Sequence, residues 1–107
     1  MKEKEKEAVR EFLVPYVECF VYCFNLESTD KWKKKFCKAR LENFHDEHLD
    51  RFEVETGIKL NTEKNKKEFE EIYEELFMEI VNNYLKEFKK CKNDEERDTL
   101  RFRGCDY

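Results

Sequence analysis

An uninterrupted stripe of apolar residues between Phe69 and Phe88 constrains the fold more than any other feature of this sequence. Its members follow one another at steps of one, three and four residues, which places them on one face of an α-helix. A strand would alternate at every second residue instead. We therefore expect a helix over residues 62–91, about 40 Å long at about 1.5 Å per residue. Asn61 or Thr62 is suited to cap its first turn.

The chain contains very few residues that break helices. Its 107 residues include only two glycines and one proline, too few for phosphate-cradling loops or a series of hairpin turns, so nucleotide-binding α/β folds and small β-barrels are excluded. Charged residues make up 45% of the chain and aromatic residues 15%; a disordered chain would lack the aromatics, because it buries nothing. We expect one all-α domain over residues 1–107, a small bundle of three main helices plus a short C-terminal helix.

The first of the other expected helices contains the single proline. Apolar residues from Val9 to Phe24 recur at helical spacing and predict a helix over residues 9–26. Proline is tolerated in the first turn of a helix and costs about 3 kcal/mol in its interior. Pro15 therefore marks either the start of the main helix or a kink in a longer one. Residues 1–8 alternate lysine and glutamate and form a charged tail or a solvated extension of this helix.

The remaining elements follow from the same periodicity and from one glycine. A single helix is expected over residues 30–52, because large apolar or aromatic residues recur at steps of mostly three or four: Trp32, Phe36, Leu41, Phe44, His48 and Phe52. The connection to the long helix contains Gly57, which can adopt a positive φ, and Ile58 and Leu60, which can pack against the core. A short helix is expected over residues 94–103.

Charge is segregated along the chain, although the net charge is only −4. Basic residues gather at the start of the second expected helix: Lys31, Lys33, Lys34, Lys35, Lys38 and Arg40. Acidic residues cover the outer face of the long helix: Glu68, Glu70, Glu71, Glu74, Glu75 and Glu79. Positive charge opposes the dipole at a helix N-terminus, so the lysines have another reason to be there.

Three interpretations of the basic cluster stay open. It is a solvated face or a partner of the acidic helix within the chain, a site for a protein partner, or a surface for nucleic acid or a membrane. Its aromatic neighbours Trp32 and Phe36 face inward on a helix and form no stacking platform. The acidic net charge gives no general attraction to phosphate, so no nucleic acid is expected.

Cysteines and histidines are the residues best suited to chemistry, but they form no familiar motif. Cys37, His45 and His48 lie close in sequence, yet a zinc site needs three or four converging donors and the chain has no H-E-x-x-H or C-x-x-C spacing. Lysines near Cys37 would lower its pKa and favour a nucleophile. Cys19 and Cys23 share a helix face but are only two thiols. We expect no catalytic residue, no metal and no cofactor, with a metal- or thiol-dependent enzyme as the weakest alternative.

The five cysteines also bear on the compartment. Their odd number, and their place in helical stretches, indicate reduced thiols of a cytoplasmic protein rather than a disulfide framework. No signal-peptide pattern is recognised, and the most apolar stretch falls short of the ~20 residues that span a bilayer, so no transmembrane segment is expected.

Several stretches resemble the BART (binder of Arf-like GTPase) family. The string Glu63 to Leu76, EKNKKEFEEIYEEL, is similar to the E-x-N-K start of the family's long helix. Phe44 to Glu53 resembles its F-x₇-F-[ED] element, and Tyr16 to Val21 resembles its first helix. Trp32 and Phe36 occupy places similar to its W/F…F stretch. The resemblance covers about residues 14–90.

This resemblance implies a non-enzymatic interaction module. Family members are helical bundles that bind GTP-loaded Arf-like small GTPases, whose amphipathic N-terminal helix enters a hydrophobic groove; they occur in cytoplasm, mitochondria and cilia. The expected partner is thus an Arf-like GTPase or another amphipathic helix, in a cytoplasmic or ciliary setting. We expect seven aromatic residues to line the groove: Phe20, Phe24, Phe36, Phe69, Tyr73, Phe77 and Tyr84.

The main alternative is a structural subunit held permanently in a ciliary or cytoskeletal assembly. The chain ends where the family adds further helices, so neighbouring subunits would complete its core. An isolated chain of this kind would fold poorly.

Overall fold

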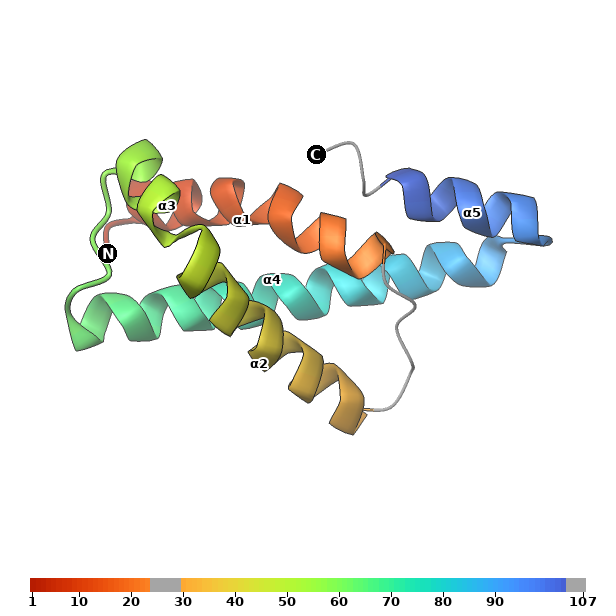
Figure 1. Cartoon of the computed structure of the whole chain (residues 1–107), viewed down its shortest axis with the longest axis horizontal. Coiled ribbons are helices and arrows are strands. Elements are labelled where there is room, and N and C mark those ends of the chain that lie inside the picture. Colours follow the sequence, from red (N-terminus) through yellow and green to blue (C-terminus); the bar gives the residue numbers. More distant parts are fainter. Residues whose placement is uncertain (24–29, 104–107) are drawn as a thin grey trace.

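The computed structural model describes residues 1–23 and 30–103, with side chains for 1–22 and 33–100 (Figure 1). Within these ranges the regular structure is entirely helical, which confirms the expected all-α class. The helices are α1 (Glu3–Cys23), α2 (Asp30–Glu47), α3 (Leu49–Thr56), α4 (Glu63–Lys90) and α5 (Asp94–Arg103). At 28 residues, α4 sets the long dimension of the molecule, which measures 46 × 28 × 25 Å.

The centre of the fold is a parallel pair, α1 and α4, which lie side by side along the long axis (Figure 1). The α-amino group of Met1 pairs with Glu68, and farther along Arg10 forms a bidentate ion pair with Glu79 at 2.8 Å. The two helices therefore run in the same direction. Helices α2 and α3 return the chain from the end of α1 to the start of α4. The apolar stripes of α1 and α4 can therefore pack against one another.

Helix α1 begins before residue 9, where the expected helix started. It begins at Glu3, so the lysine–glutamate stretch is a helical extension, and it continues through Pro15 to Cys23 rather than starting at the proline. Six residues of its apolar stripe are buried: Val9, Leu13, Tyr16, Val17, Phe20 and Val21. Fully burying one such side chain contributes about 1.5–3 kcal/mol, so the stripe outweighs the ~3 kcal/mol cost of an interior proline. Phe24 and the end of the expected helix lie outside the described residues.

The prediction of one helix over residues 30–52 is wrong, because the chain turns at His48 and divides it into α2 and α3. His48 has φ −122° and ψ −4° and occupies the N-cap position of α3, where its side chain makes no capping hydrogen bond. In a straight helix Phe44 and Phe52 would lie roughly 12 Å apart along the axis. The turn brings both rings to 5.3 Å from the ring of Phe69, and both become fully buried. The burial of two phenylalanines therefore accounts for the break.

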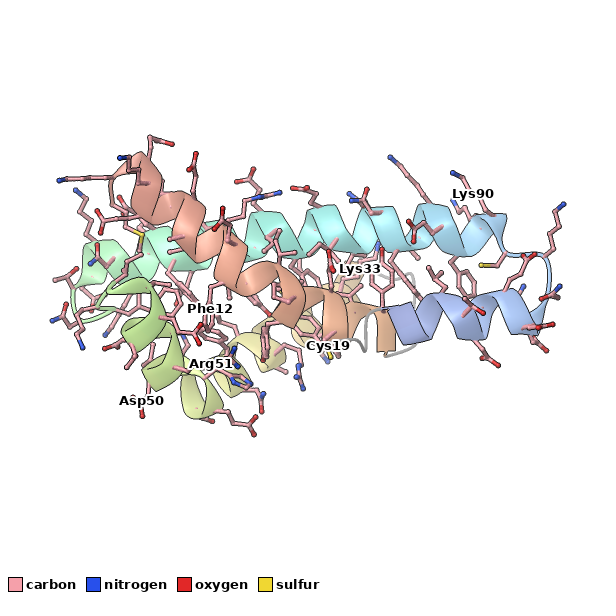
Figure 2. The ribbon with its side chains drawn as sticks, turned by 90° about the horizontal axis from the view of Figure 1, so that it is seen from above. Phe12, Cys19, Lys33, Asp50, Arg51 and Lys90 are labelled. Carbon is pink, nitrogen blue, oxygen red and sulfur yellow. The ribbon has the colours of Figure 1, made fainter. Side chains whose placement is uncertain are left out.

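Four phenylalanine rings, one from each of the first four helices, form the main aromatic cluster of the core. Phe12, Phe44, Phe52 and Phe69 meet with centroid distances between 5.3 and 6.1 Å, mostly edge to face. This geometry is favourable beyond the area it buries. Arg51 covers the outer side of the cluster, with its guanidinium 5.7 Å from the Phe12 ring (Figure 2).

The connection between α3 and α4 confirms the expectations for Gly57, Ile58 and Leu60. Gly57 has φ 71°, the left-handed conformation that ends α3, and its N–H donates to the carbonyl of Glu53. Ile58 and Leu60 are buried at 4% and 6% exposure. The Thr62 hydroxyl then accepts a hydrogen bond from the N–H of Asn65 and caps α4, as expected of one of the two candidate residues.

The last helix, α5, has the predicted bounds and folds back over the far end of the central pair (Figure 1). The Asn93 side chain accepts from the N–H of Glu96 at its start. Leu100 is buried, and the guanidinium of Arg97 lies 5.2 Å from the Phe88 ring. Apolar and cation–π contacts thus attach α5 to the bundle.

The four-ring cluster predicts where the fold is most sensitive. Phe69→Ala should lower the free energy of unfolding by about 3–5 kcal/mol, because it removes a fully buried ring that contacts two others. Val54, 83% exposed on α3, supplies the control: Val54→Ala should change stability by less than ~0.5 kcal/mol. Urea denaturation measures both, and equal effects would contradict this account of the core.

Candidate functional site

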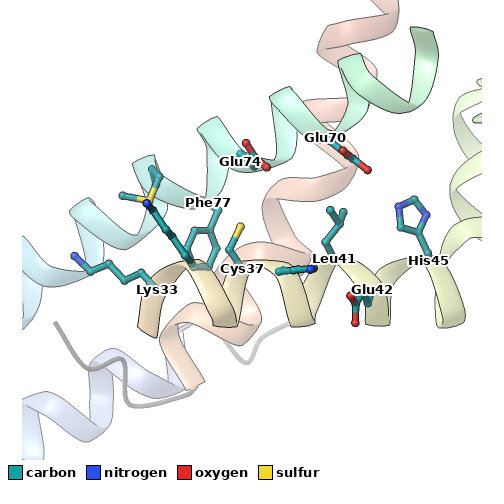
Figure 3. Close-up of a pocket in the computed structure, with 11 residues that line it drawn as sticks. Lys33, Cys37, Leu41, Glu42, His45, Glu70, Glu74 and Phe77 are labelled. Carbon is teal, nitrogen blue, oxygen red and sulfur yellow. The ribbon is translucent and has the colours of Figure 1, made fainter. Parts of the chain in front are cut away.

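A groove of about 640 Å³ lies between α2 and α4 (Figure 3). Figure 1 shows α2 crossing α4 obliquely, so the two helices meet closely over only part of their length. The groove is lined from α2 by Lys33, Lys34, Cys37, Lys38, Leu41, Glu42 and His45 and from α4 by Glu70, Glu74, Phe77 and Met78. The size is within the range of ligand sites, and the open, helix-walled form suits a peptide segment.

The floor of the groove is apolar and its rims are charged. Cys37 and Leu41 from α2 and Phe77 from α4 point into the space between the helices (Figure 3). Met78, 43% exposed, is one of two large apolar side chains that stand out on the described surface; the other is Val54. Exposed apolar surface in a concave setting is typical of a binding site.

The rims carry opposite charges that do not neutralise each other. Lysines at positions 33, 34 and 38 stand on α2, and glutamates at positions 70 and 74 stand on α4. Among the side chains that the structure describes, no ion pair joins these lysines to an acidic residue. The interpretation of the basic cluster as an internal partner of the acidic helix is therefore unsupported by any contact in this part of the chain.

Two buried tyrosines hold α2 in place beside the groove. The Tyr16 hydroxyl donates to the carbonyl of Arg40, and the Tyr73 hydroxyl donates to the carbonyl of Cys37, both at 3.0 Å. Burial, reinforced by the neighbouring Cys37 thiol, raises the pKa of Tyr73 well above its usual value. The phenol therefore stays protonated and keeps its role as a donor at any physiological pH.

The structure places most of the seven expected groove residues in the core instead. Five of them are at most 2% exposed: Phe20, Phe69, Tyr73, Phe77 and Tyr84. Phe77 also borders the groove, and Phe36 is half-buried with its ring 5.5 Å from that of Phe20. Phe24 lies outside the described residues. These aromatic residues thus form the core of the bundle. Of the expected groove residues that the structure describes, only Phe77 lines the groove.

Sequence reasoning did not assign the residues that form the rims and the exposed part of the floor. Leu41 and Met78 resemble ordinary members of apolar stripes, and nothing in their spacing marks them as accessible. The sequence did contain a signal for the charged rims, because basic and acidic residues are segregated on separate expected helices. That signal did not show that Lys38 and Glu74 would line the same groove.

The cysteine and histidine candidates are dispersed. Cys37 and His45 line the groove, whereas the His48 ring packs 5.1 Å from that of Tyr16. Within the described residues no three side chains of His, Cys, Asp or Glu are grouped as metal ligands would be. Burial, followed by the charge of Glu74, raises the pKa of Cys37 to about 11. The shift is opposite to the one that would activate the thiol, and the neighbouring lysines are not among its causes, so the alternative of a nucleophilic Cys37 gains no support.

Comparisons with known proteins add no relative to this picture. No family model, curated protein or solved structure matches the chain. None of the helices in the described ranges has the length and apolar character needed to cross a membrane.

The raised pKa of Cys37 predicts that its thiol is alkylated slowly. At pH 8 a thiol with a pKa of about 11 is ionised roughly 100-fold less than one with a pKa of about 9, so iodoacetamide should modify Cys37 about 100-fold more slowly than an unperturbed cysteine. Peptide mapping by mass spectrometry measures the rate, and the urea-unfolded chain is the control. Equal rates in the folded and unfolded chain would contradict the protection.

The tyrosine bonds predict a local effect on α2. Tyr73→Phe removes the hydroxyl that donates to the Cys37 carbonyl and should lower the free energy of unfolding by about 1 kcal/mol. Hydrogen exchange should accelerate in α2 more than in α1, because the lost bond joins α2 to the central pair. Acceleration spread evenly over all helices would instead indicate a general loss of packing.

Proposed function

We propose that this protein is a non-enzymatic interaction module that binds an amphipathic helix in the groove between α2 and α4. The observation that carries the proposal is the combination of an apolar floor with two charged rims of opposite sign. A helix that docks by its apolar face places flanking polar residues against such rims. The complementary partner has acidic residues where it faces Lys34 and Lys38 and basic residues where it faces Glu70 and Glu74.

We further propose that the helix belongs to a GTP-loaded Arf-like small GTPase. The support is the resemblance to the BART family, whose members receive an amphipathic N-terminal helix in this manner. Part of that resemblance, the string from Glu63 to Leu76, also supplies the acidic wall of the groove. A cytoplasmic or ciliary location follows from the same resemblance.

A pull-down with nucleotide-locked partners tests the finer proposal. Arf-like proteins locked with GTP should be retained by the immobilised chain, and the GDP-locked forms should not. Equal retention, or none in either state, would rule out an effector.

A thermal melt distinguishes the interaction module from a permanent structural subunit. The closed aromatic core leads us to expect a cooperative transition of the isolated chain. A subunit whose core is completed by its neighbours would melt without a cooperative transition.

The two exposed apolar residues provide a matched pair of variants. Met78→Asp places a charge on the floor of the groove and should weaken helix binding by about tenfold or more, because the charge must be desolvated. Val54→Asp makes the same kind of change on α3, outside the groove, and should leave binding unchanged. Fluorescence anisotropy with a labelled amphipathic peptide measures both. Equal loss in the two variants would place the binding surface elsewhere.

A further inference from the structure

We propose that the groove accepts its helix in one direction, with the N-terminus of the bound helix at the Glu42 and Glu70 end and its C-terminus at the Lys33 and Lys34 end. This inference rests on the proposed function and specifies the partner: a helix with basic residues in its first half and acidic residues in its second. The basis is a gradient of charge along the groove, in addition to the difference between its two walls.

The gradient arises because α2 and α4 run in opposite directions along the groove. Phe36 lies 6.3 Å from Phe77 at one end, and Phe44 lies 5.3 Å from Phe69 at the other. Figure 3 shows Lys33 and Phe77 toward one end of the groove and His45 and Glu70 toward the other. From their positions in sequence, Lys34 and Met78 belong to the first end, Glu42 belongs to the second, and Lys38 and Glu74 lie between. One end is basic, and carboxylates dominate the other.

The dipole of α2 adds to this gradient. Lys33 and Lys34 lie within the first two turns of α2, near the helix terminus that carries partial positive charge, and Glu42 lies in the second half of α2, toward the terminus where the partial charge is negative. These side chains work against the helix that bears them. The lysines therefore need a favourable interaction outside α2, which an acidic segment of a bound partner supplies.

A bound helix experiences the gradient in two ways that favour the same direction. Its own dipole places partial positive charge at its N-terminus, which the carboxylate end attracts, and partial negative charge at its C-terminus, which the lysines attract. Side chains of matching sign strengthen both contacts and set the orientation. The lining from Lys33 to His45 spans roughly 18 Å of helix, long enough for about three turns of a partner.

Two synthetic peptides test the direction directly. Both carry the same apolar stripe and the same composition and are stapled to equal helicity. One has its basic residues first and its acidic residues second; the other has the charges in the reverse order. We expect the basic-first peptide to bind the full chain about tenfold more tightly at low salt, measured by fluorescence anisotropy, and the difference to shrink at high salt.

A pair of charge reversals locates the effect. Lys34→Glu should reduce the preference for the basic-first peptide by about threefold or more, because it removes positive charge from the groove. Lys35→Glu makes the identical change one residue along, on an exposed side chain outside the groove lining, and should leave the preference unchanged.

The outcomes separate this inference from the proposed function. Equal binding of the two peptides, or preference for the acidic-first peptide, would overturn the direction and leave helix binding in place. If neither peptide binds, the helix-binding function fails and the direction fails with it. Binding to phosphatidylserine vesicles that is lost in Lys34→Glu, without any peptide preference, would assign the lysines to a lipid surface and also overturn the inference.

Discussion

The meeting of four phenylalanine rings, one from each of the first four helices, is the contact on which the rest of this structure depends. Phe12 and Phe69 belong to the central parallel pair, and Phe44 and Phe52 attach the segment that connects the pair. A parallel pair is possible only if that connecting segment returns along the bundle and is held there. The cluster satisfies this condition, and the turn at His48 follows from the need to bring both Phe44 and Phe52 to the same ring.

The groove is a consequence of how α2 is attached. Aromatic contacts fix it near Phe44 and Phe36, and the tyrosine hydroxyls bind its backbone carbonyls at Cys37 and Arg40. These contacts involve the inner side of α2 and leave the side toward the acidic face of α4 without a covering element. The apolar lining of the groove therefore includes Leu41 and Met78, whereas most of the aromatic residues expected there are buried in the core.

Much of the fold could be predicted because it depends on local physics. The bounds of α4 and α5, the cap at Thr62 and the positive φ of Gly57 follow from periodicity and from residue types that act within a few positions. The turn at His48 could not, because its cause is a contact with Phe69 on a distant helix. The aromatic residues expected to line the groove could not be assigned for a related reason. An apolar stripe shows which face of a helix is buried, but only packing decides whether a ring such as Tyr73 lies inside the core or beside a groove.

The parallel arrangement of α1 and α4 also has a consequence during synthesis. The apolar stripe of α1 is completed before α4 exists, and its ion-pair partners lie far along the chain, as Arg10 and Glu79 illustrate. At about 5–20 residues per second, the ribosome needs several seconds to produce the intervening segment. Throughout that interval α1, which is rich in valine and phenylalanine, lacks α4, the helix against which it packs most extensively. This protein is therefore expected to depend on chaperones that shield emerging apolar segments more than a bundle of sequential hairpins of the same size would.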